Sequence, residues 1–80
     1  MKGIVESVSN RNGMAAVRLE NGEYMVLEPF TCDFIVGETI SGLRDEHGGQ
    51  YVNFLEQGIR EEVYVQAIQA SRQVAMSLLS

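Results

Sequence analysis

The sequence has little of what a secreted or membrane protein needs. Cys32 is the only cysteine, so no internal disulfide can form. The longest uninterrupted apolar runs are only a few residues, far short of the ~20 residues of a membrane span. The segment Met1–Glu6 lacks the long apolar core of a signal peptide. We therefore expect a cytoplasmic protein with a reduced cysteine and no membrane contact.

Basic side chains are also scarce. The 80 residues include six Lys and Arg against eleven Asp and Glu, which gives a formal net charge of −5. Binding to a phosphate backbone draws its free energy from Lys and Arg, so this balance argues against strong nonspecific affinity for nucleic acid. A local basic patch is still compatible with the total charge.

Residue sets for catalysis or metal binding are missing. His47 is the only histidine and follows Asp45 and Glu46 in a turn, where three consecutive side chains cannot easily converge on one ion. No nucleophile and orienting carboxylate are placed around it. Cys32 lies in an apolar loop without the basic neighbour that a reactive thiolate needs. We expect no catalytic residue, no metal site and no cofactor, and hence no enzyme activity.

Three short apolar stretches separated by two turns make up the first 28 residues. The first turn spans Asn10–Gly13, and the second is Asn21-Gly22. Asn-Gly between alternating apolar residues is a strong hairpin signal, because both residues tolerate the positive φ angles of a type I′ turn. Pro29, the only proline, ends the third stretch because proline cannot donate to a sheet ladder. This pattern predicts a three-stranded meander.

Alternation around the Asn21-Gly22 turn divides the second and third strands into two faces. The polar ends of one set identify it as the outer face. The predicted core set is Ala15, Val17, Leu19, Met25 and Leu27. The predicted outer set is Met14, Ala16, Arg18, Tyr24, Val26 and Glu28. This outer set is a protein-binding patch, a face covered by the C-terminal helix, or simply a mildly apolar surface.

The middle of the chain continues the β pattern. Residues 30–37 form an apolar irregular connection that is expected to lie over one mouth of a barrel. Residues 38–43 predict a fourth strand, and residues 45–49 are rich in turn formers. Residues 50–55 predict a short extra strand, because Tyr51 and Val52 favour pleated structure.

Two interpretations fit the C-terminal segment. Residues 61–79 have the periodicity of one long helix, but β-branched and aromatic residues crowd positions 63–68. We favour a fifth strand ending at Ile68, followed by a helix over residues 71–79 with Ser71 as its N-cap. The predicted apolar face of this helix packs on the barrel or forms a dimer contact, and it consists of Val74, Ala75, Leu78 and Leu79.

Five short strands with a loop after the third resemble an OB-fold, and the specific likeness is to the cold-shock domain. The segment from Gly3 to Val17 aligns without a gap with that family's Gly-x-Val-Lys-Trp-Phe…Gly-Phe-Gly-Phe-Ile pattern. Asn21-Gly22-Glu23 stands at the family's Asp-Gly turn, and Val36–Ile40 resembles the start of its fourth strand. A weaker likeness runs to the S1-type barrel of translation initiation factor one. The sequence thus predicts one all-β domain over residues 1–80, a five-stranded OB-fold-like barrel to about residue 68 with a short C-terminal helix.

The resemblance implies binding of single-stranded nucleic acid, which cold-shock domains achieve by stacking bases on outward aromatic residues. The positions of those aromatics hold other residues here, since Glu6-Ser7-Val8 replaces Lys-Trp-Phe and Met14 and Ala16 replace the two strand-two phenylalanines. We expect either a small OB-fold module with weak affinity for single-stranded RNA or DNA, or a protein-interaction or structural module that has lost this binding, with a homodimer as one form of it. The candidate nucleic-acid or partner-binding face consists of Lys2, Arg11, Met14, Ala16, Arg18, Tyr24 and Val26.

Overall fold

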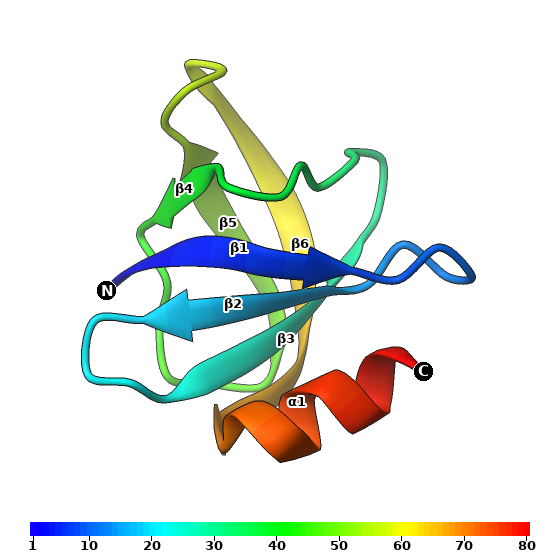
Figure 1. The fold of residues 1–80 in the computed structure, drawn as a ribbon. Coiled ribbons are helices and arrows are strands. Elements are labelled where there is room, and N and C mark those ends of the chain that lie inside the picture. Colours follow the sequence, from blue (N-terminus) through cyan, green and yellow to red (C-terminus); the bar gives the residue numbers. More distant parts are fainter.

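Six strands close into a barrel in the computed structural model, which describes residues 1–80 (Figure 1). A single helix follows the last strand and lies against the outside of the barrel. The strands are β1 (Lys2–Val8), β2 (Ala15–Leu19), β3 (Tyr24–Pro29), β4 (Thr39–Ser41), β5 (Gly48–Phe54) and β6 (Ile59–Ala70), and the helix is α1 (Arg72–Leu79). This confirms the predicted fold class of an all-β barrel with a short C-terminal helix.

The order around the barrel is β1-β2-β3-β6-β5-β4, and β4 returns to pair with β1. Every neighbouring pair is antiparallel. The barrel has six strands where the sequence predicts five, because the expected extra strand is a full member: β5 pairs with β6 along its whole length. Closure gives every strand a neighbour on both sides, although β4 pairs with β5 only through Ile40–Phe54 and Ser41–Asn53.

The predicted core set is confirmed. All five of its side chains are buried inside the barrel, where they join residues from β1, β4, β5 and β6. Phe34, in the connection between β3 and β4, stacks on Phe54 with ring centroids 5.8 Å apart. This connection therefore closes one mouth of the barrel with an aromatic side chain, as its apolar composition predicts.

The turn between β2 and β3 differs from the predicted type I′ geometry. Only Gly22 has a positive φ, of 87°, and Asn21 does not. The side-chain oxygen of Asn21 instead accepts a hydrogen bond from the Glu23 amide at 2.9 Å. This local bond satisfies the backbone of a longer loop, in which a single glycine in the left-handed region is sufficient.

The C-terminal segment is a strand followed by a helix, as favoured above, and the single long helix is excluded. β6 is the longest strand because residues 59–65 pair with β5 and residues 63–70 pair with β3, the two stretches overlapping at residues 63–65. Ser71 caps α1, with its hydroxyl accepting a hydrogen bond from the Val74 amide at 3.2 Å. The helix lacks the length and apolar character needed to cross a membrane.

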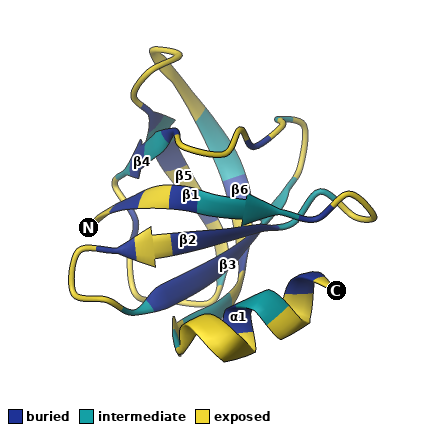
Figure 2. Ribbon diagram, in the orientation of Figure 1, coloured by how far each residue is buried: buried dark blue, intermediate teal, exposed yellow.

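The apolar face of α1 is narrower than predicted. Ala75 and Leu79 are buried against the sheet, whereas Val74 and Leu78 are exposed (Figure 2). Packing of all four side chains on the barrel, one of the two predicted alternatives, is therefore wrong for Val74 and Leu78, and the dimer contact stays a prediction. A helix of eight residues resting on a convex barrel contacts it along one line only, so residues adjacent in sequence to the contact turn away from it.

Candidate functional site

The predicted binding face on β2 and β3 lies beneath α1. Ala16, Tyr24 and Val26 are buried there and form a second apolar cluster with Ala75 and Leu79 of the helix. Met14 lies at the edge of this cluster and is half-buried. Of the three alternatives for the outer set, the structure therefore supports a face covered by the C-terminal helix. Three of the seven candidate residues are not accessible to a partner while this helix is docked.

Polar contacts hold both ends of α1 on the barrel. The Glu6 carboxylate accepts a hydrogen bond from the Tyr24 hydroxyl and another from Nε of Arg72, each at 2.6 Å. The bond from Tyr24 is the main cause that lowers the pKa of Glu6, with partial burial opposing it and Arg72 assisting. The same bond raises the pKa of Tyr24. At the other end, the Arg11 guanidinium donates to the carbonyl of Ser80, so this candidate cation also contacts the helix.

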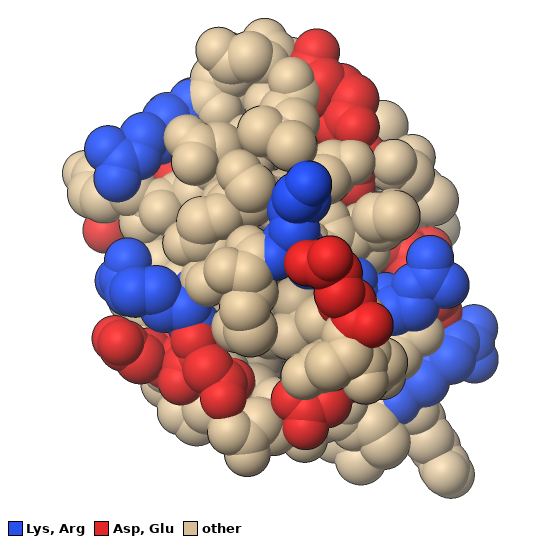
Figure 3. Space-filling model, turned by 90° about the vertical axis from the view of Figure 1, so that its left-hand side faces the viewer, with Lys and Arg blue, Asp and Glu red and all other residues tan.

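Lys2 and Arg18, the two remaining candidates, lie on the outer face of β1 and β2. Arg18 pairs with Ile4, and both cations line an open hollow of about 430 Å³ that also includes Thr39 of β4. Glu20 lines the same hollow. Figure 3, viewed from the side of the N-terminus and the β2–β3 turn, shows acidic groups among the basic ones and no continuous basic surface.

A different surface carries the exposed aromatic side chains. Tyr51 of β5 is 54% exposed and Tyr64 of β6 is 40% exposed. Phe30, directly after β3, is 56% exposed and contacts Tyr64 edge to face with centroids 6.4 Å apart. We call the surface formed by Phe30, Tyr51 and Tyr64 the aromatic face. It comprises three of the chain's six aromatic residues, two others being the stacked pair in the core and the last being Tyr24 under α1.

Strand register places charged groups among these rings. Tyr51 pairs with Glu62 and Tyr64 pairs with Gly49, so the four residues form a square on the outer surface. The Arg60 guanidinium lies 5.3 Å from the centroid of the Tyr51 ring, which is a cation–π distance. Beside Tyr64, Glu28 accepts a hydrogen bond from Gln66 at 2.7 Å.

Sequence reasoning missed the aromatic face, although a signal for it was present. Gln50, Val52 and Phe54 point inward on β5, so Gly49 and Tyr51 must point outward. Recognising this requires knowing that β5 is a full strand paired with β6. Residues 50–55 are predicted from the sequence only as a short extra strand, and all seven predicted binding residues lie before residue 27, from Lys2 to Val26.

Cys32 packs against the barrel core and is half-buried. Burial, followed by the negative charge of Glu61, raises the pKa of its thiol above the ordinary value. Because the thiolate is the nucleophile, this environment makes Cys32 a poor one. Elsewhere in the chain, no group of three His, Cys, Asp or Glu side chains is arranged to hold a metal ion.

No protein-family model, curated protein or solved structure matches this chain. The likeness to the cold-shock domain therefore depends on the quoted residues and on the OB-like barrel. Any functional assignment must come from the surfaces described above.

Proposed function

We propose that this domain is a protein-interaction module that binds its partner through the aromatic face. The observation that supports this most is the exposure of three aromatic side chains, Phe30, Tyr51 and Tyr64, on one side of an acidic domain. Tyrosine and phenylalanine are enriched at protein interfaces, because they bury a large area at a small cost in side-chain entropy. A free cysteine is consistent with a partner in the reducing cytoplasm.

The charge of the molecule supports a protein partner over nucleic acid. The net charge is −5, and α1 covers Ala16, Tyr24 and Val26 on the face that the cold-shock resemblance indicates. Tyrosine rings can stack nucleobases, but the phosphates would then approach Glu28 and Glu62. Like charges brought together at an interface oppose binding and select against such a partner.

The test is a selection of 12-residue random peptides displayed on phage, with the 80-residue domain immobilised. We expect enriched peptides whose affinity for Tyr64→Ala and Tyr51→Ala is lower by about tenfold or more, as for interface hot spots. Val74→Ala is the matched control, because Val74 is an exposed apolar side chain on α1. Enriched peptides that bind Tyr64→Ala and Tyr51→Ala as well as the wild type would refute the aromatic face, and so would a selection that enriches none.

A second candidate is weak binding of single-stranded nucleic acid in the hollow between Lys2 and Arg18, as the cold-shock likeness implies. The observation in its favour is that the largest hollow of the molecule is lined by two cations beside the apolar Ile4. Fluorescence anisotropy of labelled (dT)12 and (rU)12 at low salt tests it. Two phosphate contacts predict a log–log salt slope of about −1.4. Affinity unchanged in Arg18→Glu would eliminate this candidate.

A further inference from the structure

We infer that the partner presents an arginine on an extended segment, and that its guanidinium binds between Tyr51 and Tyr64 against the Glu62 carboxylate, which lies over Gly49. This inference rests on the proposed function and specifies its partner. The proposed contact is more specific than apolar packing, because the Glu62 carboxylate between the two rings favours a positively charged group.

The geometry of the square places the Glu62 carboxylate where a guanidinium from outside can reach it. Gly49 and Tyr64 pair directly, as do Tyr51 and Glu62, so the two tyrosines stand on one diagonal. Gly49 has no side chain and is exposed. An oxygen of Glu62 lies 3.0 Å from the position that a Cβ on Gly49 would occupy. The carboxylate therefore leans over the glycine, between the two aromatic rings.

The charges around the square are unbalanced. The outward-facing residues of β3, β5 and β6 include two carboxylates, Glu28 and Glu62, and one cation, Arg60, because Glu61 pairs with the buried Val52 and lies on the inward side. Gln66 donates to Glu28, but Glu62 has no hydrogen bond or ion pair with any group of the protein. A half-buried carboxylate without a partner is stabilised by an arriving cation, and such complementarity sets the choice of partner.

The protein already contains one example of the proposed contact. Arg60 stacks its guanidinium on Tyr51 within the same sheet. Arginine suits this environment better than lysine, because its planar group stacks on aromatic rings and binds carboxylates with two parallel hydrogen bonds. Tyr64 offers a second tyrosine ring to a guanidinium from outside, and Glu62 adds a carboxylate that the Arg60 contact lacks.

The closed barrel determines how a peptide can bind. A peptide that adds as a strand needs an unpaired sheet edge. At Tyr64, β6 is paired with β5 on one side and with β3 on the other. A segment that binds over the square therefore docks on the sheet surface through its side chains. An extended chain with spaced side chains can contact both tyrosines, which are two residues out of direct register.

The experiment is an NMR titration of the 15N-labelled domain with four probes: (Arg-Pro)4, (Ser-Pro)4, (Glu-Pro)4 and (dT)12. Alternating proline keeps the peptides extended, so that they differ only in charge. We expect (Arg-Pro)4 to shift the amide signals of Gly49, Tyr51 and Tyr64, with an affinity about tenfold higher than that of (Ser-Pro)4. We expect (Glu-Pro)4 to leave these signals unchanged.

Two variants test the role of the square. Glu62→Gln should lower the affinity for (Arg-Pro)4 about tenfold. Glu20→Gln should leave this affinity unchanged, because Glu20 is an exposed acid that lines the hollow beside Lys2 and Arg18, away from the square. Gly49→Ala should also weaken binding, because its methyl group displaces the Glu62 carboxylate. Far-UV circular dichroism confirms that each variant remains folded.

The two proposals fail separately. If the phage peptides require Tyr64 but lack arginine and lysine, the proposed function stands and the arginine inference is overturned. Equal affinity of (Arg-Pro)4 and (Ser-Pro)4, or full affinity in Glu62→Gln, also overturns it. Shifts of the aromatic face by (dT)12 alone would assign this surface to nucleic acid and overturn both proposals.

Discussion

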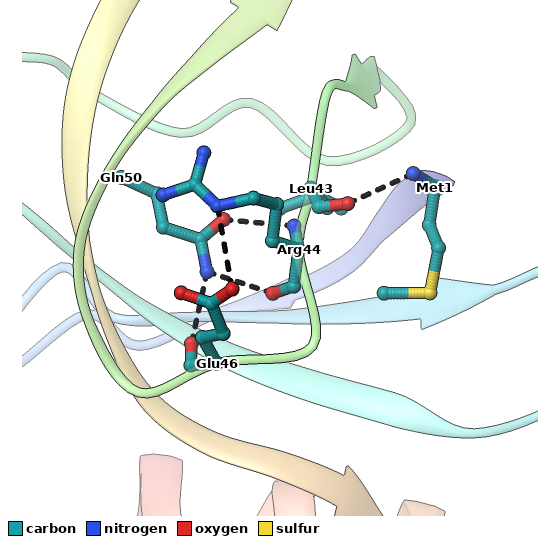
Figure 4. Close-up of polar contacts among 5 residues, drawn as sticks. All are labelled: Met1, Leu43, Arg44, Glu46 and Gln50. Carbon is teal, nitrogen blue, oxygen red and sulfur yellow. Dashed lines mark hydrogen bonds and ion pairs between the residues drawn. The ribbon is translucent and has the colours of Figure 1, made fainter.

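Gln50 is the most deeply buried polar side chain of the protein and organises the loop before β5 (Figure 4). Its side-chain oxygen accepts from the Arg44 amide at 2.9 Å. Its Nε2 donates to the carbonyls of Arg44 and Glu46 at 2.7 and 2.9 Å. The N-terminal amino group of Met1 donates a hydrogen bond to the Leu43 carbonyl in the same loop. One amide side chain thus satisfies three backbone groups that have no strand partner.

Gln50→Leu should destabilise the domain by about 2 kcal/mol. Leucine has a similar volume but cannot pair with these backbone groups. The Arg44 amide and the Glu46 carbonyl are then left unpaired or reach water by moving the loop, whereas the Arg44 carbonyl keeps its bond from the Glu46 amide. Urea unfolding followed by circular dichroism measures the change. Gln73→Leu is the matched control, because Gln73 is exposed on α1 and makes no side-chain hydrogen bond. A loss for Gln50→Leu below about 0.5 kcal/mol would show that the loop does not depend on this side chain.

At the scale of elements, α1 owes its position to few contacts. Two buried side chains, Ala75 and Leu79, pack on β2 and β3, and the polar contacts of Glu6 and Arg11 hold the two ends. An isolated helix of eight residues is not stable in water, so it exists because it is docked. A β-bulge at Glu6, between the pairs Val5–Val17 and Ser7–Ala16, accompanies the Glu6 contact.

The Glu6 contact predicts a pH dependence of the docking of α1. The pKa of Glu6 is lowered in the folded state, so its contribution is fully present above the ordinary carboxyl pKa of about 4.3. The contribution is lost as the pH falls through the lowered folded-state pKa. We expect amide hydrogen exchange in α1 to speed up on acidification more in the wild type than in Glu6→Gln, after correction for intrinsic exchange. An equal response of both proteins would refute the role of this carboxylate.

At the scale of the whole molecule, the barrel is closed by strands that are distant in sequence. β1 pairs with β4, and β3 pairs with β6, so neither closing contact can form until most of the chain is in place. Both halves of the barrel share one core of 13 buried side chains. No part of the sheet can therefore be stable without the rest.

This topology predicts cooperative and relatively slow folding. We expect a single unfolding transition in urea, with tyrosine fluorescence and circular dichroism coinciding. Refolding should take milliseconds to seconds, as is usual for small proteins dominated by non-local strand pairing. Stopped-flow refolding measures this rate. A dominant microsecond phase, or two separated equilibrium transitions, would contradict the single shared core.

Much of the fold can be predicted from local patterns. Alternation along residues 15–27 identifies the core residues of β2 and β3, because in a strand neighbouring side chains point to opposite faces. Ser71 marks the start of α1 correctly, because the N-cap interaction involves only residues four positions apart or fewer. Such predictions succeed because their physical causes are local.

The accessible surface could not be predicted in the same way. Tyr24 and Val26 point out of the barrel as expected, yet α1 buries them. Tyr51 and Tyr64 lie close together only because residue 49 pairs with residue 64. Both outcomes depend on which elements contact each other, and alternation within one strand contains no information about its neighbours.

The sequence by itself therefore determined the β class, the strands that line the core and the position of the helix, since these follow from short-range periodicity and capping. Only the tertiary structure decided which outward faces meet solvent. Docking of α1 removed the face on β2 and β3, and the pairing of β5 with β6 assembled the aromatic face with its unpaired carboxylate. The candidate site moved from one side of the barrel to another because exposure is a property of the packed molecule.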